Sequence, residues 1–225
     1  MRPIVTISIV VYLAIAAVSA QVQRFDQLVR EDFFAGITGD TARFDRAMTT
    51  CEQALATDPR NAAALVWHGA GLLVRSGLAF REGRSDEGIS LNIRAMREMN
   101  DAVAMRPDDV QVLIPRAAIL LASGRFAPAD QVRSMARTAA ADYEKVLAIE
   151  APYFPTLATH SRGELLGGLA TAYRLSGDDD KATSYLRRIS AELPGTAYDT
   201  KAQGWLADLA SVRQNDHFCL GCHVK

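Results

Sequence analysis

The stretch GELLGGLATAYRLSGDDDKATSYLRRISAELPGT, residues 163–196, decides the fold. Apolar and small residues recur in each half at the three- and four-residue steps of one buried helix face: Leu169, Ala170 and Tyr173, then Ala182, Leu186 and Ile189. Gly177-Asp178 separates the two halves, and Pro194 follows the second. Because glycine suits a tight turn and proline cannot continue a helix, the stretch predicts two helices joined by a short turn.

The pattern of the second helix occurs four times along the chain. Its members are Ala47, Cys51, Ala54 and Pro59; Ala95, Met99, Ala102 and Pro107; Ala139, Tyr143, Val146 and Pro152; and Ala182, Leu186, Ile189 and Pro194. The third copy has a one-residue slip at the proline, and the four prolines lie 48, 45 and 42 residues apart. Internal repeats of this length indicate an all-α helical-repeat protein.

At residues 163–196 the chain resembles the tetratricopeptide repeat (TPR) family, in which small residues let paired helices approach and a proline ends each repeat. The resemblance implies a right-handed solenoid of about four helix pairs plus a capping helix. The second and third repeats are longer than the family's 34 residues, with additions between Gly69 and Ala95 and between Gly124 and Ala139. These additions weaken the transfer of the family's peptide-binding groove to this chain.

Two further amphipathic segments flank the repeats and complete a predicted repeat domain of residues 21–213. The first starts at Phe25, ends near Gly36 or Gly39, and contains the adjacent Phe33 and Phe34. Adjacent residues cannot both face one side of a helix, so one of these rings is expected to remain available for a partner. The second segment, residues 197–212, is the expected capping helix, with Tyr198, Ala202, Trp205, Leu206 and Leu209 inward and Asp199, Lys201 and Asp208 turned elsewhere.

Residues 1–20 are typical of an export signal. Arg2 precedes a mainly apolar run over residues 4–17, and Val18-Ser19-Ala20 forms a small-residue cleavage site. The chain is therefore expected to mature at Gln21, to be periplasmic or extracellular, and to have no membrane span after cleavage. An uncleaved membrane anchor is the alternative, although the run is short for a spanning helix.

Charge and motif content exclude several functions. The signal contains one basic and no acidic residue, so the mature chain has 24 basic and 26 acidic residues and a formal net charge of −2. Nucleic-acid binding is not predicted, because it usually requires a basic patch. No nucleophile–base constellation or phosphate loop is present, so no enzymatic activity is predicted. Cys51 lies in a helical pattern and is expected to be a small buried side chain.

The C-terminal tail, residues 214–225, contains the pattern with the most specific chemistry. Cys219 and Cys222 are separated by two residues, and His223 follows directly, which is the c-type haem attachment signature. The two thiols would add to the two vinyl groups of one haem, which gives covalently attached haem c, and His223 would be the proximal iron ligand. Only two residues follow His223, so the preceding chain or a neighbouring molecule must cover the haem.

The distal ligand and two other interpretations of the tail stay open. His217, His160 or His68 could be the distal haem ligand, with His217 better placed to reach the haem of a neighbouring molecule. A redox dithiol is the first alternative, although no strand pattern surrounds it. A metal site is the second, since zinc takes four ligands and the two cysteines, His223 and His217 could supply them.

Three functions follow. The leading hypothesis is an exported monohaem cytochrome-like repeat protein in electron transfer, whose partners are other redox carriers or further copies of itself, joined end to end in a filament. The second is an exported repeat scaffold that holds a protein partner in its concave face. The third is a dithiol or metal-binding tail protein.

Overall fold

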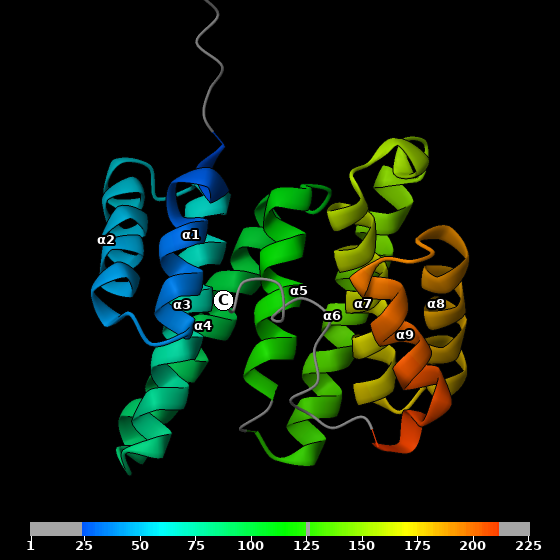
Figure 1. Cartoon of the computed structure of the whole chain (residues 1–225). Helices are drawn as coiled ribbons and strands as arrows, with labels where there is room; N and C mark the ends of the chain where they lie inside the picture. The colour runs from blue at the N-terminus through cyan, green and yellow to red at the C-terminus, as the bar shows by residue number, and fades with distance from the viewer. Residues whose placement is uncertain (1–23, 125–126, 212–225) are drawn as a thin grey trace, which may run out of the picture.

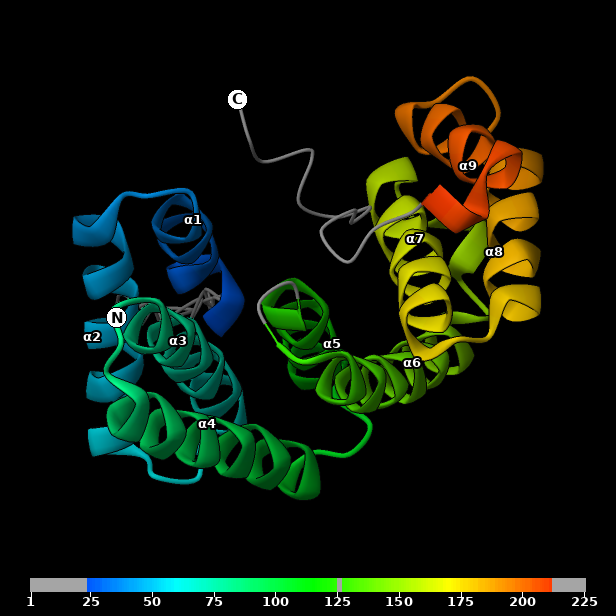
Figure 2. The ribbon, with the colours of Figure 1, turned by 90° about the horizontal axis from the view of Figure 1, so that it is seen from below.

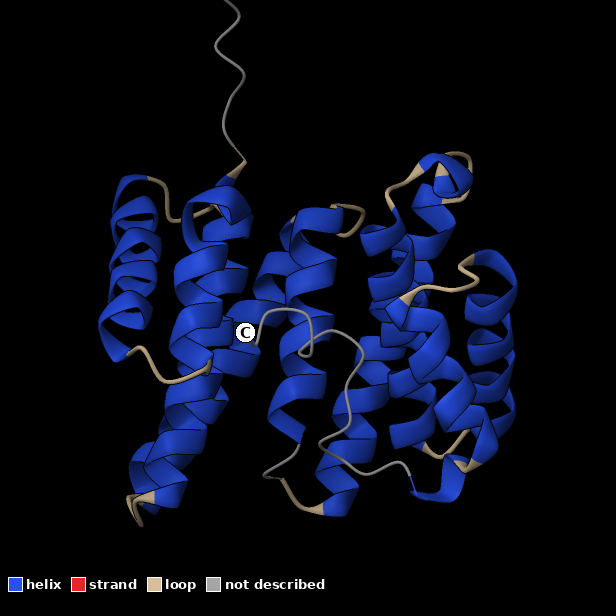
Figure 3. Ribbon diagram, viewed as in Figure 1, coloured by secondary structure: helices blue, strands red, loops and turns tan. Residues whose placement is uncertain are grey.

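The computed structural model describes residues 24–124 and 127–211, and within these residues all regular structure is helical (Figure 3). Nine α-helices and two short 3-10 helices follow one another there without a strand. Figure 1 shows α1 (Phe25–Ile37), α2 (Thr41–Thr57), α3 (Ala62–Arg81), α4 (Ser85–Met105), α5 (Val110–Gly124), α6 (Ala129–Glu150), α7 (Thr159–Ser176), α8 (Asp179–Glu192) and α9 (Ala197–Ala207); the 3-10 helices are η1 (Phe154–Thr156) and η2 (Leu209–Ser211).

The four repeat prolines end helices as predicted. Pro59, Pro107, Pro152 and Pro194 each lie two residues beyond the last residue of α2, α4, α6 and α8. Helix starts are fixed by side chains that accept from backbone N–H groups of the first turn, as Asp40, Asn61 and Asp178 do for α2, α3 and α8. Gly177 ends α7 with a φ of 91°, a left-handed conformation that favours glycine.

The repeat pattern marks the buried face of each even-numbered helix. All its apolar members are buried except Ala54, which is partly exposed near the end of α2. Cys51 is 0% exposed, which confirms the expected packing role, and burial raises the pKa of its thiol to about 12. Trp67 and Trp205 are also buried.

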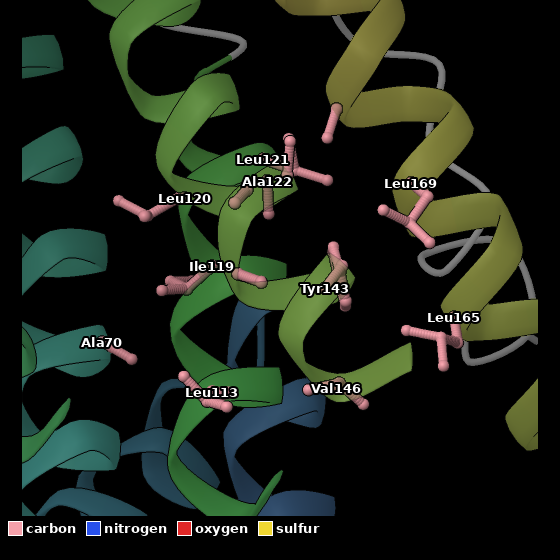
Figure 4. Packing of buried hydrophobic residues seen from close by; sticks show 14 of the residues in the cluster. Ala70, Leu113, Ile119, Leu120, Leu121, Ala122, Tyr143, Val146, Leu165 and Leu169 are labelled. Atoms are coloured by element: carbon pink, nitrogen blue, oxygen red, sulfur yellow. The ribbon is translucent and has the colours of Figure 1, made fainter. Parts of the chain in front are cut away.

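The helices pack in sequence and form two rows. Each helix contacts the next one, and each odd-numbered helix also contacts the next odd-numbered helix from α1 through α9. Figure 2 shows that the array curves, with the odd-numbered helices along its inner side and the even-numbered helices outside. In Figure 4, apolar side chains of α5, α6 and α7 meet where the inner helices join.

The additional residues of the second repeat lengthen both of its helices. α3 and α4 contain 20 and 21 residues, against 13 and 17 in α1 and α2. The polar stretch at Arg81–Glu87 contains the turn between them, with Gly83 at a φ of 75°. α3 is long and apolar enough to cross a membrane, but 61% of its most apolar window is buried inside the protein. Such burial is typical of a core helix.

The last helix differs from the sequence prediction in two respects. α9 ends at Ala207, before the expected limit of residue 212, and a 3-10 turn follows it. The prediction that Asp199 turns away from the core is wrong, because its side chain is buried. The carboxylate accepts hydrogen bonds from the Gly195 backbone N–H at 2.8 Å and from Gln203 Nε2 at 2.9 Å, so it caps the preceding turn. These hydrogen bonds, first of all the one from Gly195, lower the pKa of Asp199.

Candidate functional site: an inner cavity

The predicted haem-attachment residues lie outside the described part of the chain. Cys219, Cys222, His223 and His217 fall in residues 212–225, and the predicted signal falls in residues 1–23. Of the candidate iron ligands, the structure therefore places His160 and His68.

An inner cavity of about 390 Å³ lies between the inner helices and the α6 side chains beneath them. Its lining combines residues of α1, α3, α5, α6 and α7, so it lies on the concave side of the array seen in Figure 2. Concave sites of about 300–1,000 Å³ are typical of small-molecule and cofactor binding.

The floor of the inner cavity is mainly apolar. α5 contributes Ile114, Ala118, Ile119 and Ala122, and α1 contributes Phe34. The two alanines lie one turn apart on the same helix and leave space that larger side chains would fill. An apolar lining favours the burial of a flat apolar ligand.

Phe34 is the partly exposed member of the aromatic pair, as the sequence analysis expected. Phe33 is only 2% exposed and packs against Trp67, with ring centroids 5.1 Å apart. The Phe34 ring meets the same tryptophan edge-on at 6.4 Å and borders the inner cavity. Phe34 thus presents its ring to an occupant of the cavity.

His160 lines the α7 wall of the inner cavity. It lies in the first turn of α7, and half of its side chain is exposed. Its Nδ1 lies 2.9 Å from the hydroxyl of Tyr198 on α9, and its Nε2 lies 3.1 Å from Oε1 of Glu164 one turn further along α7. The ring is therefore held on both sides, with Nε2 next to a carboxylate that also lines the cavity.

His68 lies in the core and does not line the inner cavity. It is 3% exposed, with Nδ1 2.6 Å from Oε2 of Glu98 on α4 and Nε2 3.8 Å from Glu52 on α2. Burial raises the pKa of Glu98, but hydrogen bonds from His68 and Arg94 outweigh it and hold that pKa below its ordinary value. This contact joins α3 to α4, and it directs the His68 ring toward the outer helices.

Charged groups lie on the α1 side of the inner cavity. Arg24 and Arg30 line it together with Asp26, which accepts from Arg24 Nε at 3.0 Å and lies 4.0 Å from Arg30. Two guanidinium groups share this one carboxylate, so the wall can pair with further anionic groups.

Trp67 also lines the inner cavity. Its Nε1–H is buried without a hydrogen-bond partner among residues 24–124 and 127–211. A buried donor without a partner costs about 1–3 kcal/mol.

These residues fit a haem. An apolar floor suits the macrocycle, an imidazole on the α7 wall suits the iron, and the arginines on the opposite wall suit the propionate carboxylates. Among the described residues no group of three or more histidines, cysteines or carboxylates could hold a metal ion by itself.

No protein-family model matches this sequence, and no curated protein matches it.

Proposed function

We propose that this chain is an exported repeat protein that carries one covalently attached haem c and transfers electrons. The observation that carries the proposal is the motif formed by Cys219, Cys222 and His223, whose spacing matches haem attachment. The inner cavity supports it, because it offers an apolar surface and an imidazole in the chain that precedes the motif.

The helices that form this surface would be a right-handed TPR-like solenoid. Four helix pairs, each with a proline two residues past its second helix, followed by α9, match the repeat count of that architecture. Contacts between successive odd-numbered helices support the same arrangement, because each repeat of a solenoid contacts its neighbours.

The protein residues would hold the haem, limit water and set its orientation. The motif cysteines would bond to the haem edge, and His223 would ligate the iron from one side. When bound, the haem iron supplies a one-electron redox couple. The apolar residues of α5 and α1 would exclude water from the macrocycle, and Arg24 and Arg30 would orient its propionates.

The electron partners would be other redox carriers or further copies of this chain. Docking of one tail on the repeats of the next molecule is the alternative to a haem covered by its own chain, and it would give a filament, because such a contact does not close. Particle size measured against protein concentration, with the haem attached, tests this assembly directly.

The proposal is tested by producing the chain in a host with a working haem-attachment system. We expect one haem per chain and a visible absorption band that stays with the polypeptide after acid denaturation and solvent extraction. Cys219→Ala combined with Cys222→Ala should remove the band, whereas Cys51→Ala, which alters a buried core thiol, should leave it. Extraction of all the haem from the wild-type protein would contradict the proposal.

A second candidate function is a scaffold that holds a protein partner on the concave side. The inner cavity favours it, because Phe34 and Ile114 are apolar side chains at a partly exposed surface. The absorption spectrum separates the two functions, since a scaffold without haem has no visible band.

A further inference from the structure

We propose that the inner cavity seats the haem of the same chain and that His160 is its distal iron ligand. This inference rests on the proposed function and deepens it, since it names the covering surface and the sixth ligand. The occupant is the chain's own tail, residues 214–225, together with the haem bonded to it.

The end of the described chain places the tail within reach of the cavity. The Nε–H of Arg174, near the C-terminal end of α7, donates to the carbonyl oxygen of Leu209 at 2.9 Å and holds the chain there. His160 lies fourteen residues earlier on the same helix, a distance of about 21 Å at the α-helical rise. Cys219 follows Leu209 by ten residues, which span up to about 33 Å when extended. The motif can therefore reach the level of His160 without a second molecule.

The hydrogen bonds of His160 suit an iron ligand. Histidine ligands usually donate their second ring N–H to a neighbouring group, which fixes the tautomer and orientation of the ring. The Tyr198 hydroxyl at Nδ1 can accept from this N–H, because a hydroxyl both donates and accepts. Nε2 can then offer its lone pair to iron once the ring carries its single proton on Nδ1.

Glu164 must leave Nε2 when iron binds there. The carboxylate lies 3.1 Å from Nε2, and its side chain is 29% exposed. The exchange replaces this contact of Nε2 with the iron bond. The His68 ring cannot reach an iron in the inner cavity in this way, because it is enclosed between α2, α3 and α4.

The tail of the same chain explains the cavity better than a neighbour's tail does. Residues of α7 from His160 to Thr171 line the cavity, and Arg174 of the same helix holds Leu209 shortly before the tail. Attachment in the same chain also gives a high effective concentration, whereas a neighbour's tail must pay for association.

The inference is tested on the full mature chain with haem attached. We expect the ferric wild-type protein to be six-coordinate and low-spin at micromolar and at submicromolar concentration. His160→Gly should keep the covalent haem but become high-spin, and added imidazole should restore the low-spin spectrum. His217→Gly, the competing histidine, should keep the low-spin spectrum.

Several results would overturn the inference. A five-coordinate wild-type haem, a low-spin spectrum in His160→Gly, or a high-spin spectrum in His217→Gly would each exclude His160 as the ligand. A low-spin state that is lost on dilution would show that a neighbouring molecule supplies the ligand. The absence of covalent haem would instead refute the proposed function, so the two failures are distinguishable.

A second measurement tests haem binding in the inner cavity independently of the His160 iron ligand. Ala118 lines the inner cavity, whereas Ala148 is exposed on α6 and does not line it. Ala118→Trp should fill the cavity, displace the haem and speed its bleaching by peroxide several-fold, and Ala148→Trp should leave the rate unchanged. Equal bleaching rates in folded Ala118→Trp and wild-type protein would overturn the seat in this cavity.

Discussion

The buried ion pair between α5 and α6 gives the sharpest prediction about how the array is held together. Arg116 donates to Asp142 through Nε at 2.7 Å and through Nη2 at 2.6 Å, and the two side chains are only 11% and 6% exposed. Nη1 of the same guanidinium donates to Asn100 Oδ1 of α4 at 2.9 Å. Arg116 therefore joins three consecutive helices where the first half of the array meets the second.

Asp142→Ala should cost far more stability than the loss of a surface ion pair. It leaves the Arg116 charge buried without its carboxylate, and breaking a buried pair in this way costs about 3–5 kcal/mol. For a chain of this length such a loss lowers the melting temperature by about 6–20 °C. The exposed pair Arg75–Asp45 is the matched control, and Asp45→Ala should cost at most about 1 kcal/mol.

Urea unfolding followed by circular dichroism measures both variants, and a combined replacement tests the physical cause. Arg116→Met with Asp142→Leu removes both charges, so it should recover most of the stability that Asp142→Ala loses. A loss below about 1 kcal/mol in Asp142→Ala, or a combined variant as unstable as the single one, would refute a dominant role of the buried charge.

Three further predictions concern pH, packing and thiol chemistry. The pKa of Glu98 is lowered in the folded protein, so its ionised carboxylate stabilises the fold at pH values above the ordinary carboxyl pKa. The stability advantage of wild type over Glu98→Gln should therefore shrink as the pH falls through about 4 toward that lowered pKa. Urea titrations between pH 3 and 7 measure this advantage. Gly163→Ala would bring a Cβ to 2.4 Å from the Tyr198 ring and should destabilise the protein by about 1–3 kcal/mol. The Cβ of Gly77→Ala would meet no atom within 4 Å, so this variant should stabilise α3 by up to about 1 kcal/mol. Thermal melts of both variants measure the two effects. The Cys51 thiol, with its pKa raised to about 12, should not react with a disulfide reagent at pH 8 in the folded haem-bound protein, and a thiol count after denaturation should then find one cysteine rather than three.

Much of the fold could be predicted because it follows from local patterns. Two signals predicted α2, α4, α6 and α8: a proline two residues past each helix, and apolar residues spaced three or four apart along it. Both signals depend only on residues in or next to a single helix. The additions to the second repeat were recognised as a length difference, and the structure places them in α3 and α4.

Errors arose where a contact crosses from one element to another. Asp199 was expected to face away from the core because it is charged, yet the turn that ends α8 supplies a backbone N–H to its carboxylate. α9 was expected to continue to residue 212, since the apolar pattern runs on through Leu209, which lies instead in a 3-10 turn whose carbonyl oxygen accepts from Arg174.

The inner cavity could not be predicted from the sequence. Its lining comes from five helices, and residues as far apart as Phe34 and Thr171 border the same space. The sequence offers His160 and His68 equally as candidate distal ligands. Only distant partners distinguish them: His160 contacts Tyr198, 38 residues away, at the cavity, and His68 contacts Glu98, 30 residues away, in the core. The adjacent phenylalanines gave the one local signal, because neighbouring side chains point in different directions from a helix, and Phe34 is the one that remains partly exposed.

The central claim, that the haem of this chain lies in its own inner cavity, is tested most directly by methyl NMR of the haem-bound protein with labelled isoleucines. Ile114 and Ile119 line the cavity, whereas Ile89 and Ile93 lie exposed on the outer helix α4. We predict large chemical-shift differences between the ferric and ferrous states at Ile114 and Ile119 and none at Ile89 and Ile93, with the pattern unchanged on dilution. Redox-dependent shifts that spare Ile114 and Ile119, or that disappear on dilution, would contradict the account.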